Sequence, residues 1–139
     1  MIRLVVFETY PLFHLGIKVA LKGDNHIYVA GNASNVTTLF SLLTGITEEV
    51  ILLGVNPCDN NICVDVARCI RHDYPKLKIL AFADEGTEHT IRLMMEDGIN
   101  GFIGKWQANC YELGKAIQQI ASGEKYIGEV DRNKQYFRN

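Results

Sequence analysis

VILLGVNPCDN, residues 50–60, begins with four apolar residues that do not alternate with polar ones and then reaches Gly54. A short unbroken apolar run that ends at a glycine is typical of a strand buried on both faces. Strands of this kind occur in parallel sheets that helices cover on both sides. In such proteins ligands and reactive side chains gather where strands end, but here that position holds a glycine, which has no side chain.

Strand-like apolar runs and helical periodicities alternate along the chain outward from this stretch. We expect strands at 2–7, 27–30, 50–53, 78–83 and 101–104, and helices at 11–21, 35–43, 60–74, 87–97 and 108–122. Strict alternation with short connections implies parallel strands, right-handed crossovers and helices on both faces. The expected fold is α/β and flavodoxin-like, a doubly wound five-stranded parallel sheet of order 2-1-3-4-5 with five helices.

Local signals refine the boundaries of these elements. Gly31 can end the second strand, and Ser34 or Asn35 can cap the helix that follows. In the third helix the spacing predicts one inward face that is made of Ile62, Val66, Cys69 and Ile70.

The composition is that of an ordinary globular domain. The chain has 139 residues, 47% apolar and 22% charged, with a net charge of −2. A surface that binds nucleic acid by itself is usually strongly basic, so we expect no direct DNA binding by this segment. The sequence shows neither an apolar run of about 18 residues nor a signal-peptide pattern. We therefore predict a cytoplasmic protein without membrane contact.

The cysteines do not form a metal or redox motif. None of the four is part of a C-x-x-C pair, and they are expected to be buried free thiols: Cys58, Cys63, Cys69 and Cys110. The four histidines are scattered, and none stands at a plausible ligand spacing from a cysteine or carboxylate. The sequence therefore predicts no metal site in these residues.

Five residues follow or end strands at the edge where the carboxyl ends of a parallel sheet meet. They are Glu8 and Thr9 after the first strand, Gly54 at the third, Ala83 at the fourth and Lys105 after the fifth. In a doubly wound sheet the binding crevice lies at this edge, where the strand order reverses. The topology therefore marks these positions as the candidate site.

The sequence resembles the receiver domain of bacterial response regulators, in the CheY-like superfamily and the LuxR/NarL-type subgroup. Five stretches in the right order carry the resemblance, which covers about residues 2–130: YPLFHLGIKVAL at 10–21, VAGNASN at 29–35, PKLKILAFA at 75–83, EDGINGFIGK at 96–105 and AIQQIASGEKYIG at 116–128. The resemblance implies a receiver-like domain over residues 1–124. Residues 125–139 then resemble a polar linker to a C-terminal DNA-binding domain that is absent here.

The resemblance also assigns roles to the strand ends, and the sequence departs from most of them. A receiver carries its phosphoacceptor carboxylate at the position of Gly54, and an acidic pair that helps to hold Mg²⁺ at the positions of Glu8 and Thr9. A hydroxyl stands at the position of Ala83 and a lysine at that of Lys105. Only the lysine and one carboxylate are kept. Phosphoryl transfer needs a nucleophile, a metal and fixed donors, so we expect a degenerate site that is not phosphorylated.

Several expectations follow for the remaining groups. With Glu8 as the one weak metal candidate, we expect no cofactor and no bound Mg²⁺. Instead, Glu8 and Lys105 are predicted to form an ion pair across the crevice. Phe102 matches the switch aromatic of receivers, and the simpler interpretation is a core phenylalanine. Asp59 is the alternative, a displaced phosphoacceptor, although a capping or solvated aspartate is the favoured interpretation.

The resulting hypothesis is an atypical receiver domain that acts in two-component signal transduction and transcription regulation. We expect no enzymatic activity, because no glycine-rich phosphate loop follows the first strand and no catalytic triad is evident. The resemblance implies homodimerisation through the 87–97, 101–104 and 108–122 face or through the helices at 11–21 and 108–122. A sensor kinase or another regulator is a possible partner, and DNA would be reached only through a C-terminal domain.

Overall fold

The computed structural model describes residues 1–44, 49–56, 60–84 and 86–129 and contains one parallel sheet. Its strands are β1 (Ile2–Phe7), β2 (Ile27–Ala33), β3 (Val50–Val55), β4 (Lys78–Ala83), β5 (Gly101–Gly104) and β6 (Tyr126–Ile127). Their order in the sheet is β2-β1-β3-β4-β5-β6, and every neighbouring pair is parallel. The predicted order of the first five strands is confirmed.

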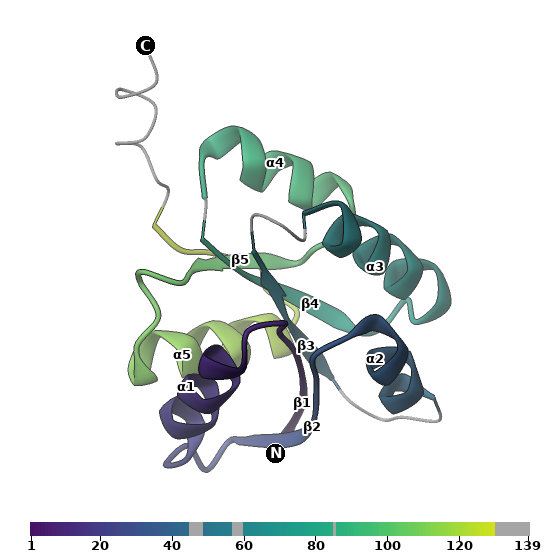
Figure 1. The fold of residues 1–139 in the computed structure, drawn as a ribbon. Helices are drawn as coiled ribbons and strands as arrows, with labels where there is room; N and C mark the ends of the chain where they lie inside the picture. The colour runs from purple at the N-terminus through teal and green to yellow at the C-terminus, as the bar shows by residue number, and fades with distance from the viewer. Residues whose placement is uncertain (45–48, 57–59, 85, 130–139) are drawn as a thin grey trace.

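Among the described residues, five helices cover the two faces of this sheet (Figure 1). They are α1 (Pro11–Leu21), α2 (Val36–Leu43), α3 (Asn60–Asp73), α4 (Glu88–Glu96) and α5 (Cys110–Ala121). The buried side chains of α1 and α5 belong to one apolar cluster, and those of α2, α3 and α4 belong to another on the opposite face. The predicted doubly wound α/β architecture is therefore confirmed, with a core layer on each side of the sheet.

β3 is the central strand that the opening stretch predicts. It lies between β1 and β4. All six of its residues are buried, and residues 50–53 have no exposed surface at all. Side chains on both faces of this strand are covered, which explains why its sequence is apolar without alternation.

The described sheet has a sixth strand that is not among the five strands predicted from the sequence. Tyr126 and Ile127 pair with Gly101 and Phe102 of β5, although they lie in the segment predicted to be a polar tail beyond residue 124. Tyr126 is buried in the core, and the Gly128 N–H donates to the Phe102 carbonyl at 2.9 Å. A strand of two residues is too short to show a periodic pattern in the sequence. It forms because the edge of β5 is available for pairing.

One local prediction is also corrected, and another is confirmed. β2 does not end at Gly31 but continues to Ala33. Its pairing with β1 shifts between Leu4 and Val5, where β2 has one extra residue, Ala30, and the pairing resumes at Gly31. The next helix, α2, begins at Val36, and its N-cap is Asn35, one of the two predicted caps, whose side chain accepts from the Thr38 N–H.

The inward face of α3 is rotated from the predicted one. Its buried side chains are Cys63, Val66, Ala67 and Ile70. Ile62 is 47% exposed, and Cys69 is exposed as well. The correct stripe keeps the predicted period but is turned about the helix axis, which periodicity alone does not fix.

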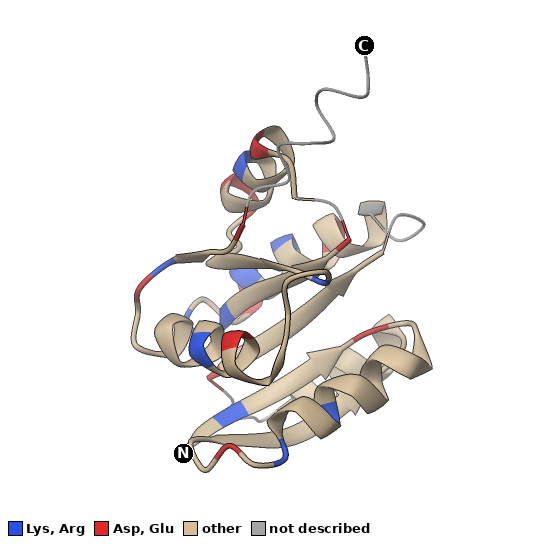
Figure 2. Ribbon diagram, turned by 90° about the vertical axis from the view of Figure 1, so that its left-hand side faces the viewer, with Lys and Arg blue, Asp and Glu red and all other residues tan. Residues whose placement is uncertain are grey.

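Charged residues of both signs are spread over the described part of the chain. Lys and Arg residues are interspersed with Asp and Glu residues on the helices and loops, while the strands are mostly uncharged (Figure 2). Within the described part of the chain, no helix is long and apolar enough to cross a membrane.

Candidate functional site

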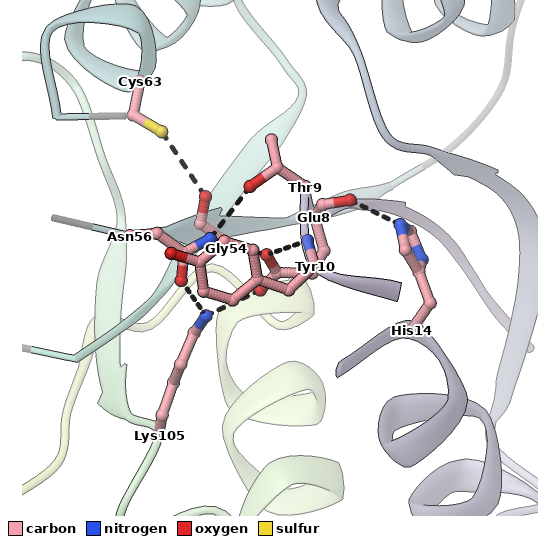
Figure 3. Close-up of polar contacts among 8 residues, drawn as sticks. All are labelled: Glu8, Thr9, Tyr10, His14, Gly54, Asn56, Cys63 and Lys105. Carbon is pink, nitrogen blue, oxygen red and sulfur yellow. Dashed lines mark hydrogen bonds and ion pairs between the residues drawn. The ribbon is translucent and has the colours of Figure 1, made fainter. Parts of the chain in front are cut away.

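Four of the predicted site residues, Glu8, Thr9, Gly54 and Lys105, gather at the carboxyl edge of the sheet (Figure 3). Glu8 directly follows β1, Gly54 lies within β3 opposite Phe82 of β4, and Lys105 directly follows β5. The backbone N–H of Lys105 donates to the carbonyl of Ala83 at 2.9 Å, which ties the end of β5 to the end of β4. The topology therefore brings together side chains that are up to 97 residues apart in sequence.

A buried ion pair lies at the centre of the site. The Lys105 Nζ donates to Glu8 Oε1 at 2.7 Å. The two side chains are 4% and 0% exposed, respectively. This is the ion pair predicted from the sequence. Because both charges are removed from water, each strongly depends on the other and on further hydrogen bonds.

Asn56, which was not among the predicted site residues, supplies those further hydrogen bonds. Its side-chain amide donates to Glu8 Oε2 at 2.7 Å and to the Thr9 hydroxyl at 3.1 Å. Its carbonyl oxygen accepts from Lys105 Nζ at 2.5 Å. Asn56 is completely buried. A signal was present, because it is the first polar residue after the apolar run and lies two positions beyond Gly54.

The carboxylate of Glu8 is fully engaged by these groups. Oε1 accepts from Lys105, and Oε2 accepts from Asn56 and from the backbone N–H of Tyr10 at 3.1 Å. The backbone is held too, because His14 Nε2 lies 2.6 Å from the Glu8 carbonyl oxygen and can donate to it. Glu8 is therefore fixed as a structural anion.

Gly54 is required by the position of Glu8. A Cβ atom built on Gly54 would lie 2.5 Å from Glu8 Oε1, 2.8 Å from its Cδ and 3.0 Å from the Phe7 carbonyl oxygen. Real Cβ contacts are not that short, so any side chain at position 54 would have to displace the carboxylate. The space in which a receiver would hold its phosphoacceptor is thus occupied by Glu8.

Aromatic rings surround the other side of the Lys105 ammonium group. Its Nζ lies 3.9 Å from the ring centroid of Phe13, 5.2 Å from that of Phe82 and 5.5 Å from that of Tyr10. The negative face of an aromatic ring attracts a cation within about 6 Å, and the attraction is stronger when the cation is desolvated. Oxygen atoms and ring faces together therefore enclose the ammonium group.

The remaining predicted positions are also defined. Ala83 is buried and offers no hydroxyl group. Phe102 has no exposed surface and packs in the core, with its ring 6.1 Å from that of Trp106. Trp106 is 47% exposed. The burial of Phe102 agrees with the simpler interpretation, a core phenylalanine.

The described residues do not fit Mg²⁺. Among residues 1–44, 49–56, 60–84 and 86–129, no group of three His, Cys, Asp or Glu side chains could hold a metal ion. The Glu8 carboxylate already uses both oxygens within the protein. Mg²⁺ requires octahedral oxygen coordination and usually takes one or two carboxylates together with water and phosphate.

Two sets of sequence predictions have a mixed outcome. Cys63 is buried as expected, but Cys69 and Cys110 are exposed, so the prediction of buried thiols is wrong for these two. Cys58 and Asp59, the alternative phosphoacceptor, lie outside the described residues.

No protein-family model matches the chain, but several curated proteins are similar to it. The transcriptional regulatory protein MctR of Rhizobium johnstonii is 26% identical over 126 residues, which are 91% of this chain and 58% of MctR. DegU of Brevibacillus brevis is 24% identical over 127 residues, 91% of this chain and 52% of DegU. The nitrate/nitrite response regulator NarL of Escherichia coli K12 is 24% identical over 128 residues, again 91% of this chain and 58% of NarL. The chain spans about half the length of these relatives.

Solved structures share the fold. The isolated receiver domain of RcsB from Salmonella enterica serovar Typhimurium superposes with a TM-score of 0.83 at 16% identity, over the whole of both chains. A LuxR family DNA-binding response regulator from Silicibacter pomeroyi gives a TM-score of 0.75 at 24% identity, over 93% of this chain and 98% of that one. The architecture is therefore that of receiver domains.

Proposed function

We propose that this CheY-like receiver domain is an atypical one that accepts no phosphoryl group. It would act in two-component signal transduction and transcription regulation through contacts with other proteins. It would have no enzymatic activity of its own, and DNA would be reached only through a further domain. The similarity to MctR, DegU and NarL supports the regulatory role. The loss of phosphorylation is supported by the site itself.

One observation carries the proposal. At the position of the phosphoacceptor the chain has Gly54, and the space above it holds the Glu8 carboxylate. A carboxylate nucleophile cannot be supplied by glycine. The group that could have helped to hold a metal is instead tied to Lys105 and Asn56. In the described part of the site, this arrangement supports neither a nucleophile at position 54 nor a bound charge-neutralising metal, both of which phosphoryl transfer needs.

A phosphorylation assay tests the proposal. The chain is incubated with acetyl phosphate and Mg²⁺ and its intact mass is measured, with a receiver that keeps its aspartate as the positive control. We expect no added phosphoryl mass. Asp59→Asn in the same assay addresses the alternative acceptor, because a phosphoryl group that appears on the wild type and is lost from this variant would establish Asp59 as the acceptor.

The contacts through which such a domain acts are proposed from its exposed apolar side chains. On α1, Leu12, Leu15 and Val19 are 76%, 59% and 64% exposed, and they follow one another at helical spacing. Val19 shares a surface hollow with Tyr111 of α5, which is 72% exposed. These exposed apolar side chains favour the α1–α5 face for homodimerisation. The alternative α4–β5–α5 face is less suitable, because β6 pairs with β5 and covers its edge.

Sedimentation at several concentrations tests this interface. Leu15→Glu should shift the chain toward the monomer. Leu93→Glu is the matched control, since Leu93 is an exposed leucine on α4 and is 47% exposed. If the Leu93 variant dissociates and the Leu15 variant does not, the α4–β5–α5 face is the interface.

A further inference from the structure

We infer that the ammonium group of Lys105 serves as a built-in cation that replaces the divalent metal of a working receiver and closes the crevice to Mg²⁺. This inference rests on the proposed function and concerns the same site. In it, Lys105 supplies the positive charge that a bound metal would otherwise supply. The site would then keep one state, whatever the concentration of metal.

The surroundings of Lys105 are those of a bound cation. An ammonium group has three N–H donors. Two oxygen atoms, Glu8 Oε1 and Asn56 Oδ1, lie 2.7 and 2.5 Å from Nζ. On the remaining side the closest ring, that of Phe13, has its centroid at 3.9 Å. The ammonium group therefore has a complete shell of oxygen and ring contacts, with the side chain only 4% exposed.

The buried charges of the site also balance one another. Glu8 contributes one negative charge and Lys105 one positive charge, and both side chains are buried. A divalent ion entering beside them would leave a net positive charge in a place that water does not reach, and burial of uncompensated charge is strongly unfavourable. Mg²⁺ could bind Glu8 only after the ammonium group had left the carboxylate.

Asn56 strengthens the exclusion. A second carboxylate at this depth would have attracted a metal, but the amide of Asn56 is neutral and bridges both charged partners. It donates to Glu8 with its nitrogen and accepts from Lys105 with its oxygen, so it fits the ion pair better than it fits a hard divalent cation. The polar groups of Glu8, Asn56 and Lys105 therefore hydrogen-bond to one another.

Thermal unfolding with and without metal tests the inference. The wild-type chain is melted in EDTA and in millimolar MgCl₂, and we expect the two melting temperatures to agree within about 1 °C. Lys105→Ala should melt about 10 °C lower in EDTA, because it leaves the Glu8 carboxylate buried without its cation. Mg²⁺ should raise the melting temperature of this variant by several degrees, since the oxygens of Glu8 and Asn56 are then available.

Two further variants serve as controls. Glu8→Gln/Lys105→Ala should lose the response to Mg²⁺, because the carboxylate that would bind it is gone. Lys115→Ala, which removes an exposed lysine of α5, should behave as the wild type does in both solutions. Should Lys105→Ala not fold, Lys105→Gln carries the same comparison, because its amide can still donate to Glu8 without supplying a charge.

Two outcomes would overturn the inference. One is a saturable rise of the wild-type melting temperature with Mg²⁺, and the other is a Lys105→Ala variant that melts at the wild-type temperature. These results are distinct from a failure of the proposed function, which would show as added phosphoryl mass. A wild type that is stabilised by Mg²⁺ but never phosphorylated would refute this inference alone.

Discussion

Replacing Lys105 with methionine removes the positive charge at the centre of the site and keeps an unbranched apolar side chain among the surrounding rings. The variant leaves the Glu8 carboxylate with no exposed surface and without its cation. Breaking a buried pair in this way costs about 3–5 kcal/mol. Two of the hydrogen bonds of Glu8, from Asn56 and from the Tyr10 N–H, survive the substitution. We therefore expect the lower end, about 3 kcal/mol.

The paired variant shows whether this loss comes from the ion pair. Glu8→Gln alone leaves the ammonium group without its carboxylate and should cost a similar free energy. The double variant Glu8→Gln/Lys105→Met has no buried charge left, so its loss should be at least about 2 kcal/mol smaller than the sum of the two single losses. Such a coupling energy is expected of two residues in direct contact.

Urea unfolding followed by circular dichroism measures these free energies. With a slope of about 1.5 kcal/mol per molar urea, a loss of 3 kcal/mol moves the midpoint by about 2 M. Lys115→Met, at an exposed position, is the control and should stay within about 0.5 kcal/mol of the wild type. A Lys105→Met variant within 1 kcal/mol of the wild type, or strictly additive losses in the cycle, would refute this account of the site.

Three other substitutions test separate parts of the structure. Gly54→Asp restores a carboxylate at the acceptor position, but the new side chain would clash with the Glu8 carboxylate. We expect it to lower the free energy of unfolding by about 3 kcal/mol and to leave the chain without a phosphoryl group. A stable, phosphorylated variant would contradict this. Burial, and next the hydrogen bond to Glu112 and the negative charge of Glu112, raise the pKa of Tyr126 from 10 to about 12. The neutral side chain therefore stabilises the folded state below pH 10, and this contribution is lost as the pH rises from 10 to 12. Tyr126→Phe should lose this pH dependence in urea unfolding, and an unchanged pH profile would show that Tyr126 is not its source. Arg71→Ala should cost about 2 kcal/mol in the same assay, because the guanidinium group donates to the carbonyls of Pro75, Leu77 and Gly98; a neutral effect would count against that role.

Much of the fold could be predicted because its signals are local. The unbroken apolar run at 50–53 marks a strand buried on both faces, and the alternation of elements fixes the parallel sheet. The strand β6 could not be found this way. Tyr126 and Ile127 form a strand only because β5 leaves an edge to pair with. In α3 the helical period was correct, but which side faces the sheet depends on packing.

The site was predicted in part for the same reason. Topology places Glu8, Gly54 and Lys105 at one edge, and a lysine without its usual carboxylate partner indicates the ion pair with Glu8. The role of Asn56 was not predicted, because a polar residue in a turn after a strand is commonplace. The ring contacts of Lys105 join residues from α1 and β4 that only the folded chain brings together.

The central claim is that the site takes no phosphoryl group, and intact mass measurement after incubation with acetyl phosphate and Mg²⁺ tests it most directly. The account predicts one species at the unmodified mass, under conditions in which a receiver with its aspartate is phosphorylated. A species heavier by one phosphoryl group, at a substantial fraction of the chain, would contradict it.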